Sequence, residues 1–356
     1  MKIYTITCSN VYNYGAILQS FALQNYLEGL GHEVKVIDYV PPYLRKISAK
    51  YRKNIVARIA RKLLYAPDYY KSSKVFTAFK HQYIHQTTIC YNLSDVRALP
   101  QPNLYIAGSD QIWNPYLNNG WDQTYYINIP GVNKVAFAAS IGCKDVGDSF
   151  ASYLKNMLSG FKNIYVREKH SVKQLYNWGI DADYVMDPVY LLSCEEWSKL
   201  CTETPKEKYI VVYALHHMQG IYDYAKHLAK SLGVKMYVIN VEIKEMRRGG
   251  DKFFWNPTVQ QFLSLLCNAE AIVSNSFHGV SFGLIFKRPI HIFDTENNDI
   301  RINNIVNLLR LEDRLCNIAD TRNLKPNTTS VESFQLLDSE IARSKMILNQ
   351  ITKEYE

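Results

Sequence analysis

The strongest constraint on the fold is a strand-to-helix crossover at residues 271–289. Three apolar residues at 271–273 predict a strand buried on both faces, and the polar residues at 274–276 are typical of a strand end and a helix cap. The apolar residues that follow predict a helix that Pro289 ends, before a second strand at 290–293. Strands that alternate with helices in this way predict a parallel sheet.

His278 lies at the start of the predicted helix, and therefore at the carboxyl edge of the predicted sheet, where open α/β sheets bind ligands. Helix-start N–H groups favour an anion, and a histidine at that place can accept or release a proton near neutral pH. A histidine that only caps or packs the helix would show the same spacing. The residues alone leave both interpretations open.

The same alternation of strands and helices runs along the whole chain. With 356 residues, 47% of them hydrophobic, the chain can bury two cores. The expected fold class is α/β, with a Rossmann-like domain at 1–195, a second at 196–330, and a C-terminal helix at 331–356 that packs back on the first domain. Strands are expected at 2–7, 33–38, 104–107, 134–138, 163–166, 182–185, 209–214, 235–239, 271–273 and 290–293. Helices are expected at 15–29, 75–84, 149–158, 171–178, 222–232, 259–266 and 300–309.

The net charge of +8 is concentrated in one segment. Eight Lys and Arg residues and no acidic residue lie between Arg45 and Lys62, an excess equal to the whole net charge. Apolar residues recur there at helical spacing, which predicts a basic amphipathic helix within an insert at 43–66. Such a helix suits an anionic membrane surface through residues 45–64, although a helix packed on the protein by its apolar face would have the same pattern. Nucleic acid is not an expected partner, because no binding motif accompanies the basic residues.

The seven cysteines are scattered, with no C-x-x-C pair and no histidine at ligand spacing. This pattern disfavours a structural zinc site or a disulfide framework. No signal segment and no run of 18 apolar residues is present, so we expect a cytoplasmic protein that contacts the inner membrane face only peripherally.

Polar loops follow two of the strands predicted in the first half. The loop with Asn13, Tyr14 and Gly15 lacks G-x-G-x-x-G and G-x-x-x-x-G-K, which argues against a dinucleotide or P-loop site. Asn13 and Gly15 can contact a polar ligand, or form a turn and an N-cap. A second loop places the acidic Asp110 near Trp113, which suits a sugar but is equally typical of a packed turn.

Arg167 follows the strand at 163–166 and offers a permanent, forked cation to a phosphate or carboxylate. It could equally pair with Glu168 or a neighbouring acid. Cations in the second half (Lys287, Arg288 and Arg301) and His278 would suit a phosphorylated donor. No cluster of metal ligands at recognisable spacing accompanies these residues, and we expect metal-independent group transfer.

Five motifs, in order along the chain, resemble the polysaccharide pyruvyl transferase family. They are NYGAILQSFAL (13–23), GSDQIWNP (108–115), VREKHSV (166–172), DPVYLL (187–192) and SNSFHGVSFGLIFKRP (274–289). The resemblance implies a fold similar to GT-B glycosyltransferases, with two Rossmann-like domains facing a central cleft. It also implies transfer of the pyruvyl unit of phosphoenolpyruvate to two hydroxyls of a sugar, as a cyclic ketal.

The resemblance further implies roles for single residues. His278 would be the acid/base histidine and Arg167 a donor-binding arginine. The reaction also needs a base for the sugar hydroxyl, and the sequence leaves Asp110 and Asp187 as alternatives. The family's downstream basic residue would be Arg301, with Lys287 or Arg288 as alternatives, and the expected donor contacts also include Ser276, Phe277 and Gly279 at the helix start. The expected acceptor contacts, from the polar loops and strand ends of the first half, are Asn13, Tyr14, Gly15, Asp110, Gln111, Trp113 and Asp187.

The expected partners are phosphoenolpyruvate, as co-substrate and with no further cofactor, and a sugar or polyprenyl-diphosphate-linked oligosaccharide of a surface or capsular polysaccharide. Two other functions fit the same scaffold, because fold alone does not set function. One is a glycosyltransferase that uses a nucleotide sugar. The other is a non-catalytic glycan-binding protein that uses Trp113 and Trp121.

Overall fold

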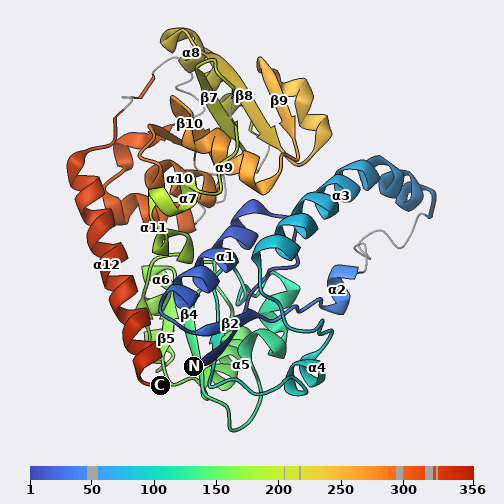
Figure 1. Ribbon diagram of the computed structural model, residues 1–356, viewed down its shortest axis with the longest axis vertical. Helices are drawn as coiled ribbons and strands as arrows, with labels where there is room; N and C mark the ends of the chain where they lie inside the picture. Colours follow the sequence, from blue (N-terminus) through green and yellow to red (C-terminus); the bar gives the residue numbers. More distant parts are fainter. Residues whose placement is uncertain (46–54, 204, 216–217, 294–299, 317–323, 326–327) are drawn as a thin grey trace. The chain divides into compact units, whose positions relative to one another are not determined.

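The computed structural model describes the chain except for residues 46–54, 204, 216–217, 294–299, 317–323 and 326–327. At 55–64 only the helical backbone is described. The chain divides into two compact units (Figure 1), and each is described by itself. Unit 1 comprises Met1–Arg58, Lys80–Leu191 and Ser339–Glu356; unit 2 comprises Ile59–Phe79 and Leu192–Asp338.

Unit 1 contains a parallel six-stranded sheet in the order β2-β1-β3-β4-β5-β6. Its central strands β3 and β4 are buried at every position, as expected where helices cover both faces. The strands are β1 (Lys2–Ile6), β2 (Glu33–Val36), β3 (Leu104–Ala107), β4 (Lys134–Ala139), β5 (Ile164–Val166) and β6 (Asp183–Tyr184). The helices are α1 (Tyr14–Gly29), α2 (Pro42–Arg45), α4 (Leu93–Arg97), α5 (Asp148–Leu158) and α6 (Lys169–Asn177), with 3-10 turns η2 (Asn118–Trp121), η3 (Gln123–Tyr126) and η4 (Pro188–Leu191).

Unit 2 contains a second parallel six-stranded sheet, in the order β12-β11-β10-β7-β8-β9. The strands are β7 (Tyr209–Tyr213), β8 (Lys235–Asn240), β9 (Lys252–Trp255), β10 (Ala271–Ser274), β11 (Ile290–Phe293) and β12 (Leu315–Cys316). The helices are α7 (Cys194–Ser198), α8 (Gln219–Leu232), α9 (Val259–Cys267), α10 (Phe277–Ile285) and α11 (Ile300–Leu309), with 3-10 turns η5 (Ile243–Arg248) and η6 (Glu312–Arg314). The predicted α/β class, with two Rossmann-like units, is confirmed.

Helix α3 (Ile55–Tyr83) differs from the expectation of two separate helices, because it runs through Pro67. Tertiary hydrogen bonds hold the residue after the proline: Asp68 Oδ1 accepts from Ile243 N at 3.0 Å and from Trp255 Nε1 at 2.7 Å. These partners lie far along the chain, so no local pattern predicts them. Most of the basic segment falls outside the described residues, and its predicted amphipathic face stays a prediction.

The last helix, α12 (Val331–Lys353), contributes its second half to unit 1. Ser344 Oγ accepts from Met186 N at 2.9 Å, and Arg343 Nη2 lies 2.5 Å from Asp183 Oδ2. Leu348 and Ile351 join one hydrophobic cluster with residues of β1 and β3. None of the helices described here is long and apolar enough to cross a membrane.

Candidate functional site

The predicted crossover of unit 2 is present, and it places His278 in the first turn of α10. Ser274, at the end of β10, donates from Oγ to Tyr213 O at 2.6 Å and accepts from Ser276 N at 3.0 Å. Ser276 is the N-cap of α10, and its Oγ accepts from Gly279 N at 3.4 Å. The His278 side chain is 6% exposed at the carboxyl edge of the sheet, with its ring edge-on to Phe277.

Gly279 is required by close packing at this crossover. A Cβ at this position would meet Ser274 Oγ at 2.2 Å and Tyr213 Cδ1 at 3.1 Å. The amides of Ser276 and Gly279 already bind serine oxygens, so an anion at this helix start would have to use other groups or displace these bonds. The glycine therefore fixes the helix start against the strand ends.

A cavity of about 240 Å³ lies at the carboxyl ends of β7 and β8, and sequence reasoning missed it. Asn240 Nδ2 donates to Ala214 O at 3.1 Å, and Asn275 Oδ1 accepts from Leu215 N at 2.9 Å. Asn275 thus connects the cavity wall to the segment that carries His278. The polar Asn240 at the end of an apolar strand was the available signal. The charged lining residues are Glu242, Lys244 and Glu245.

Of the cations expected near His278, the structure places Arg301 at the same edge of the sheet and Lys287 and Arg288 at the opposite end of α10. Lys287 and Arg288 follow the far end of α10, and nine helical residues separate the two ends by about 13 Å. The geometry therefore does not bring Lys287 to His278. Arg301 lies in the first turn of α11, which follows the carboxyl end of β11, the same edge of the sheet as His278.

In unit 1, Arg167 follows β5 and is 2% exposed, surrounded by carboxylates. Its Nη1 lies 2.6 Å from Asp187 Oδ2, its Nε 3.4 Å from Glu168 Oε1, and its Nη2 3.9 Å from Asp110 Oδ1. Burial lowers the pKa of the guanidinium, but the three carboxylates outweigh burial and raise the pKa above its ordinary value. The sequence left open whether Arg167 binds a ligand or pairs with neighbouring acids, and in the structure Arg167 pairs with neighbouring acids.

The three carboxylates of this cluster differ in exposure. The Asp187 and Glu168 side chains are 0% exposed, and Ser109 Oγ donates to Asp187 Oδ2 at 2.9 Å. The Asp110 side chain is 18% exposed and has a backbone φ of 73°, in the left-handed region that few residues other than glycine adopt. Such backbone is costly and is held in place by its surroundings. Asp110 is therefore the member of the cluster that reaches solvent.

The structure does not support the expectation that Trp113 contacts the acceptor sugar. It is fully buried, stacked on Tyr126 with ring centroids 5.6 Å apart, and it meets Phe161 edge-on. Its ring offers no face to a sugar, so the packed-turn interpretation holds. Trp121, by contrast, is 45% exposed.

In the loop before α1, Asn13 has the N-cap role that the sequence offered as an alternative to ligand binding. Asn13 is the N-cap, and its Oδ1 accepts from Ala16 N at 3.2 Å. Tyr14 and Gly15 are buried, whereas Asn13 is partly exposed at the carboxyl end of β1. Gln111 Oε1 accepts from Asn114 Nδ2 at 2.6 Å.

Asp122 is a further polar group at this edge to which the sequence assigned no role. Its Oδ2 accepts from Tyr39 Oη at 2.7 Å and from Tyr43 Oη at 3.0 Å. Burial, with Asp122 nearby, raises the pKa of both phenols above the ordinary value. The tyrosines are about 80 positions away in sequence, so only the fold could bring them together.

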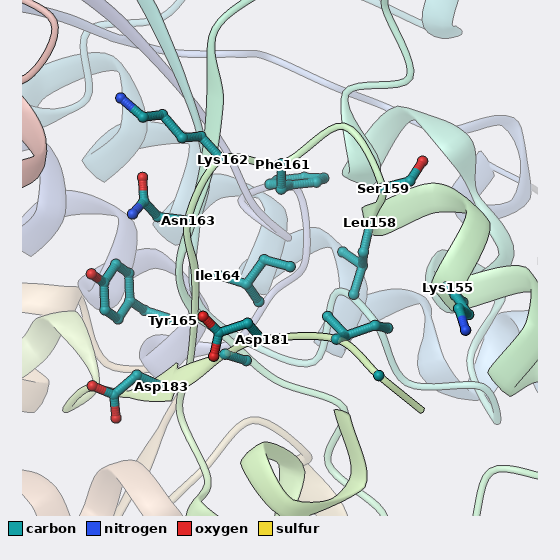
Figure 2. Close-up of a pocket in the computed structure, with 13 residues that line it drawn as sticks. Lys155, Leu158, Ser159, Phe161, Lys162, Asn163, Ile164, Tyr165, Asp181 and Asp183 are labelled. Atoms are coloured by element: carbon teal, nitrogen blue, oxygen red, sulfur yellow. The ribbon is translucent and has the colours of Figure 1, made fainter. Parts of the chain in front are cut away.

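A second cavity, of about 360 Å³, lies at the opposite edge of the unit 1 sheet (Figure 2). Its walls come from the segments that precede β5 and β6, including Lys162, Asp181 and Asp183. Asp183 is paired with Arg343, and Lys162 Nζ lies 3.2 Å from Glu354 Oε2. This cavity is separate from the Arg167 cluster, which lies at the carboxyl edge. Within the described ranges, no group of three or more His, Cys, Asp or Glu residues is placed to hold a metal ion.

The two parallel sheets, each with polar groups gathered at its carboxyl edge, define a two-unit Rossmann-like α/β protein. Residues 13–297 match the family model described as polysaccharide pyruvyl transferase. The chain therefore belongs to the polysaccharide pyruvyl transferase family. The comparison with curated proteins gave no match.

Solved structures that resemble the chain do so at low identity. A UDP-N-acetylglucosamine 2-epimerase from Rickettsia bellii matches with a TM-score of 0.53 and 11% identity, over 100% of this chain and 96% of that chain. A protein described as a UDP-N-acetylglucosamine 2-epimerase from Listeria monocytogenes matches with a TM-score of 0.52 and 12% identity, over 97% and 90%. The glycosyltransferase SnogD from Streptomyces nogalater has a TM-score of 0.47 and 9% identity, over 100% of both chains. The two epimerases show a shared fold and nothing about activity.

Proposed function

We propose that this protein transfers the pyruvyl group of phosphoenolpyruvate to two hydroxyls of a sugar, forming a ketal in surface or capsular polysaccharide synthesis. Membership of the family supports the reaction class. The observation that carries the proposal is His278, a titratable group at a helix start on the ligand-binding edge of its sheet.

The chemistry assigns His278 to proton transfer. A proton delivered to the methylene carbon of phosphoenolpyruvate makes a methyl group and leaves a cation-like carbon, which the first sugar hydroxyl attacks. The second hydroxyl then closes the ring as phosphate leaves. A positioned histidine contributes roughly 10²- to 10⁴-fold to such a step. Arg301, at the same edge of the sheet, is the proposed cation for the donor phosphate.

The carboxylate cluster of unit 1 supplies the proposed base for the sugar hydroxyl. Asp110 is preferred over Asp187, because the Asp110 side chain is 18% exposed and Asp187 is fully buried. If Arg167 bound the donor directly, its guanidinium would have to give up a contact with one of the carboxylates and bind the donor phosphate in its place. The contacts support Arg167 as the residue that positions Asp110 and Asp187.

We further propose a lipid-linked acceptor, a polyprenyl-diphosphate-linked oligosaccharide, and a site of action at the cytoplasmic membrane face. The concentration of the whole net charge in residues 45–62 supports an anionic surface as partner. The described part of α3 continues this segment with two aromatic side chains, Tyr69 and Tyr70, which are 65% and 73% exposed. Exposed tyrosines suit a membrane interface.

The decisive experiment incubates the full chain with phosphoenolpyruvate and candidate glycans, and measures ketal mass gain together with phosphate release. His278→Ala should keep the fold and lose turnover, whereas His227→Ala, on the exposed face of α8, should match the wild type. Full activity of His278→Ala would contradict the mechanism. Thermal stabilisation by a nucleoside diphosphate, but not by phosphoenolpyruvate, would favour a nucleotide-sugar glycosyltransferase instead. Glycan binding without any turnover would favour a glycan-binding protein.

A further inference from the structure

The motif at 13–23 contains a glutamine to which the proposed function assigns no role. Gln19 lies in α1 and is 0% exposed. A buried amide is costly unless it is hydrogen bonded. Gln19 Nε2 donates to Ala16 O and to Thr7 Oγ1, at 2.8 Å in each case. Because a carbonyl oxygen can only accept, the contact with Ala16 fixes which end of the amide group faces Thr7.

The Thr7 hydroxyl connects this glutamine to the loop that carries Asp110. Thr7 follows β1, Ser109 follows β3, and these two strands are neighbours in the sheet. Thr7 Oγ1 donates to Ser109 O at 2.6 Å. The hydroxyl oxygen accepts from Gln19, so its single hydrogen remains for Ser109 O. Gln19 therefore sets the direction of the hydrogen bond from Thr7 to Ser109.

The bond from Thr7 constrains the backbone of Asp110. Ser109 O belongs to the planar peptide group that precedes Asp110, so holding this oxygen fixes the plane against which the φ of 73° is defined. On the other side of the residue, Asp110 O accepts from Ile112 N at 2.7 Å and from Ser140 N at 3.1 Å. Left-handed backbone is costly and persists only where its surroundings fix it. These bonds therefore determine the direction of the Asp110 side chain.

Ser109 is also held through its side chain. Its Oγ donates to Asp187 Oδ2 at 2.9 Å, and Arg167 Nη1 lies 2.6 Å from the same carboxylate oxygen. Ser109 is 0% exposed and Thr7 is 2% exposed. A continuous set of buried hydrogen bonds thus runs within unit 1, from α1 through Thr7 and Ser109 to the carboxylate cluster.

We propose that Thr7 and Gln19 are positioning residues for Asp110. This inference rests on the proposed function, in which Asp110 is the base for the sugar hydroxyl. Thr7 holds the peptide group before Asp110, and Gln19 orients the Thr7 hydroxyl. Both side chains are buried and act through Asp110, not on the substrate. A displacement of about 1 Å in a catalytic group can cost roughly 10²-fold in rate.

The kinetic test measures ketal formation by the full chain with phosphoenolpyruvate and the glycan that the wild type converts. Thr7→Val keeps the shape of the side chain and removes the hydroxyl, so it should lower kcat by roughly 10- to 10²-fold without changing KM for phosphoenolpyruvate. Thr7→Ser restores the hydroxyl and should recover most of that loss. Thr5→Val, at a buried threonine of the same strand, should match the wild type. Unchanged kcat in Thr7→Val would overturn the proposal.

Gln19 is tested with a matched pair of glutamine variants. Gln19→Leu should lower kcat by less than Thr7→Val does, because the hydroxyl remains and loses only its orientation. Gln24→Leu changes another buried glutamine of α1, which donates to Tyr83 O at 3.1 Å, and should leave kcat unchanged. Equal kcat in the two glutamine variants would remove Gln19 from the proposal.

A double variant separates positioning from a general effect on the fold. In the Asp110→Asn background no base remains to be positioned, so adding Thr7→Val should cause little further loss of kcat. An equal loss in both backgrounds would show that Thr7 does not act through Asp110, and would overturn the proposal.

Hydrogen exchange gives a readout that does not depend on turnover. The amides of Ile112 and Ser140 should exchange faster in Thr7→Val than in the wild type, while the amides of β2 keep their wild-type rates. Thr5→Val should change neither. Unchanged exchange in Thr7→Val would overturn the positioning of Asp110. A wild type that forms no ketal, together with faster exchange in Thr7→Val, would contradict the proposed function and support the positioning.

Discussion

Replacing Arg167 by methionine removes the cation that pairs with two fully buried carboxylates. Asp187 lies 2.6 Å and Glu168 3.4 Å from the guanidinium, and both side chains are 0% exposed. Removing one partner of a buried ion pair typically costs about 3–5 kcal/mol, because the remaining charge is unpaired. We therefore expect Arg167→Met to lower the free energy of unfolding by about that amount at pH 7. The loss arises from desolvated carboxylates, not from lost packing, because methionine retains most of the side-chain volume.

The control is Arg343→Met in the same unit. Arg343 pairs with Asp183 at 2.5 Å, but the side chains are 35% and 56% exposed, so a loss of about 0–1 kcal/mol is expected. Urea denaturation measures both variants. In Arg167→Met the unpaired carboxylates should have raised pKa values in the folded state. The folded variant then binds more protons than the unfolded chain, so its deficit should shrink as pH falls from 7 to 5. Equal losses in the two variants, or a deficit independent of pH, would refute the buried-cluster argument.

Three further outcomes are expected. Asp110→Asn should lower turnover by roughly 10²- to 10⁴-fold with little change in stability. Asp187→Asn should lower both turnover and stability. A loss of stability in Asp110→Asn would contradict the assignment of Asp110 as the exposed base. Gly279→Ala should destabilise the protein by about 1–3 kcal/mol through overpacking, and Gly29→Ala, where a Cβ meets nothing within 4 Å, should not; urea midpoints compare them. The protein should sediment with anionic vesicles at low salt and be released at high salt, and equal binding to zwitterionic vesicles would count against the segment at 45–64.

The local parts of this fold could be predicted from the amino-acid order. The crossover at β10 and α10 was readable because a strand, a polar cap and a helical apolar run follow one another within a few residues. The N-cap role of Asn13 was among its predicted alternatives for the same reason. Hydrophobic periodicity and capping depend on neighbours in the chain, and both survive in the folded protein.

Other features were decided by tertiary structure alone. Asp110, Arg167 and Asp187 meet because three strands of one sheet end at the same edge, although Arg167 is 57 positions from Asp110 and 20 from Asp187 in the sequence. Trp113 has the same local sequence whether it faces a sugar or stacks on Tyr126, and only the assembled core chooses between the two. A parallel sheet joins strands through crossovers of a dozen or more residues. The contacts that set charge and exposure at its carboxyl edge are therefore distant in the chain, and only folding brings them together.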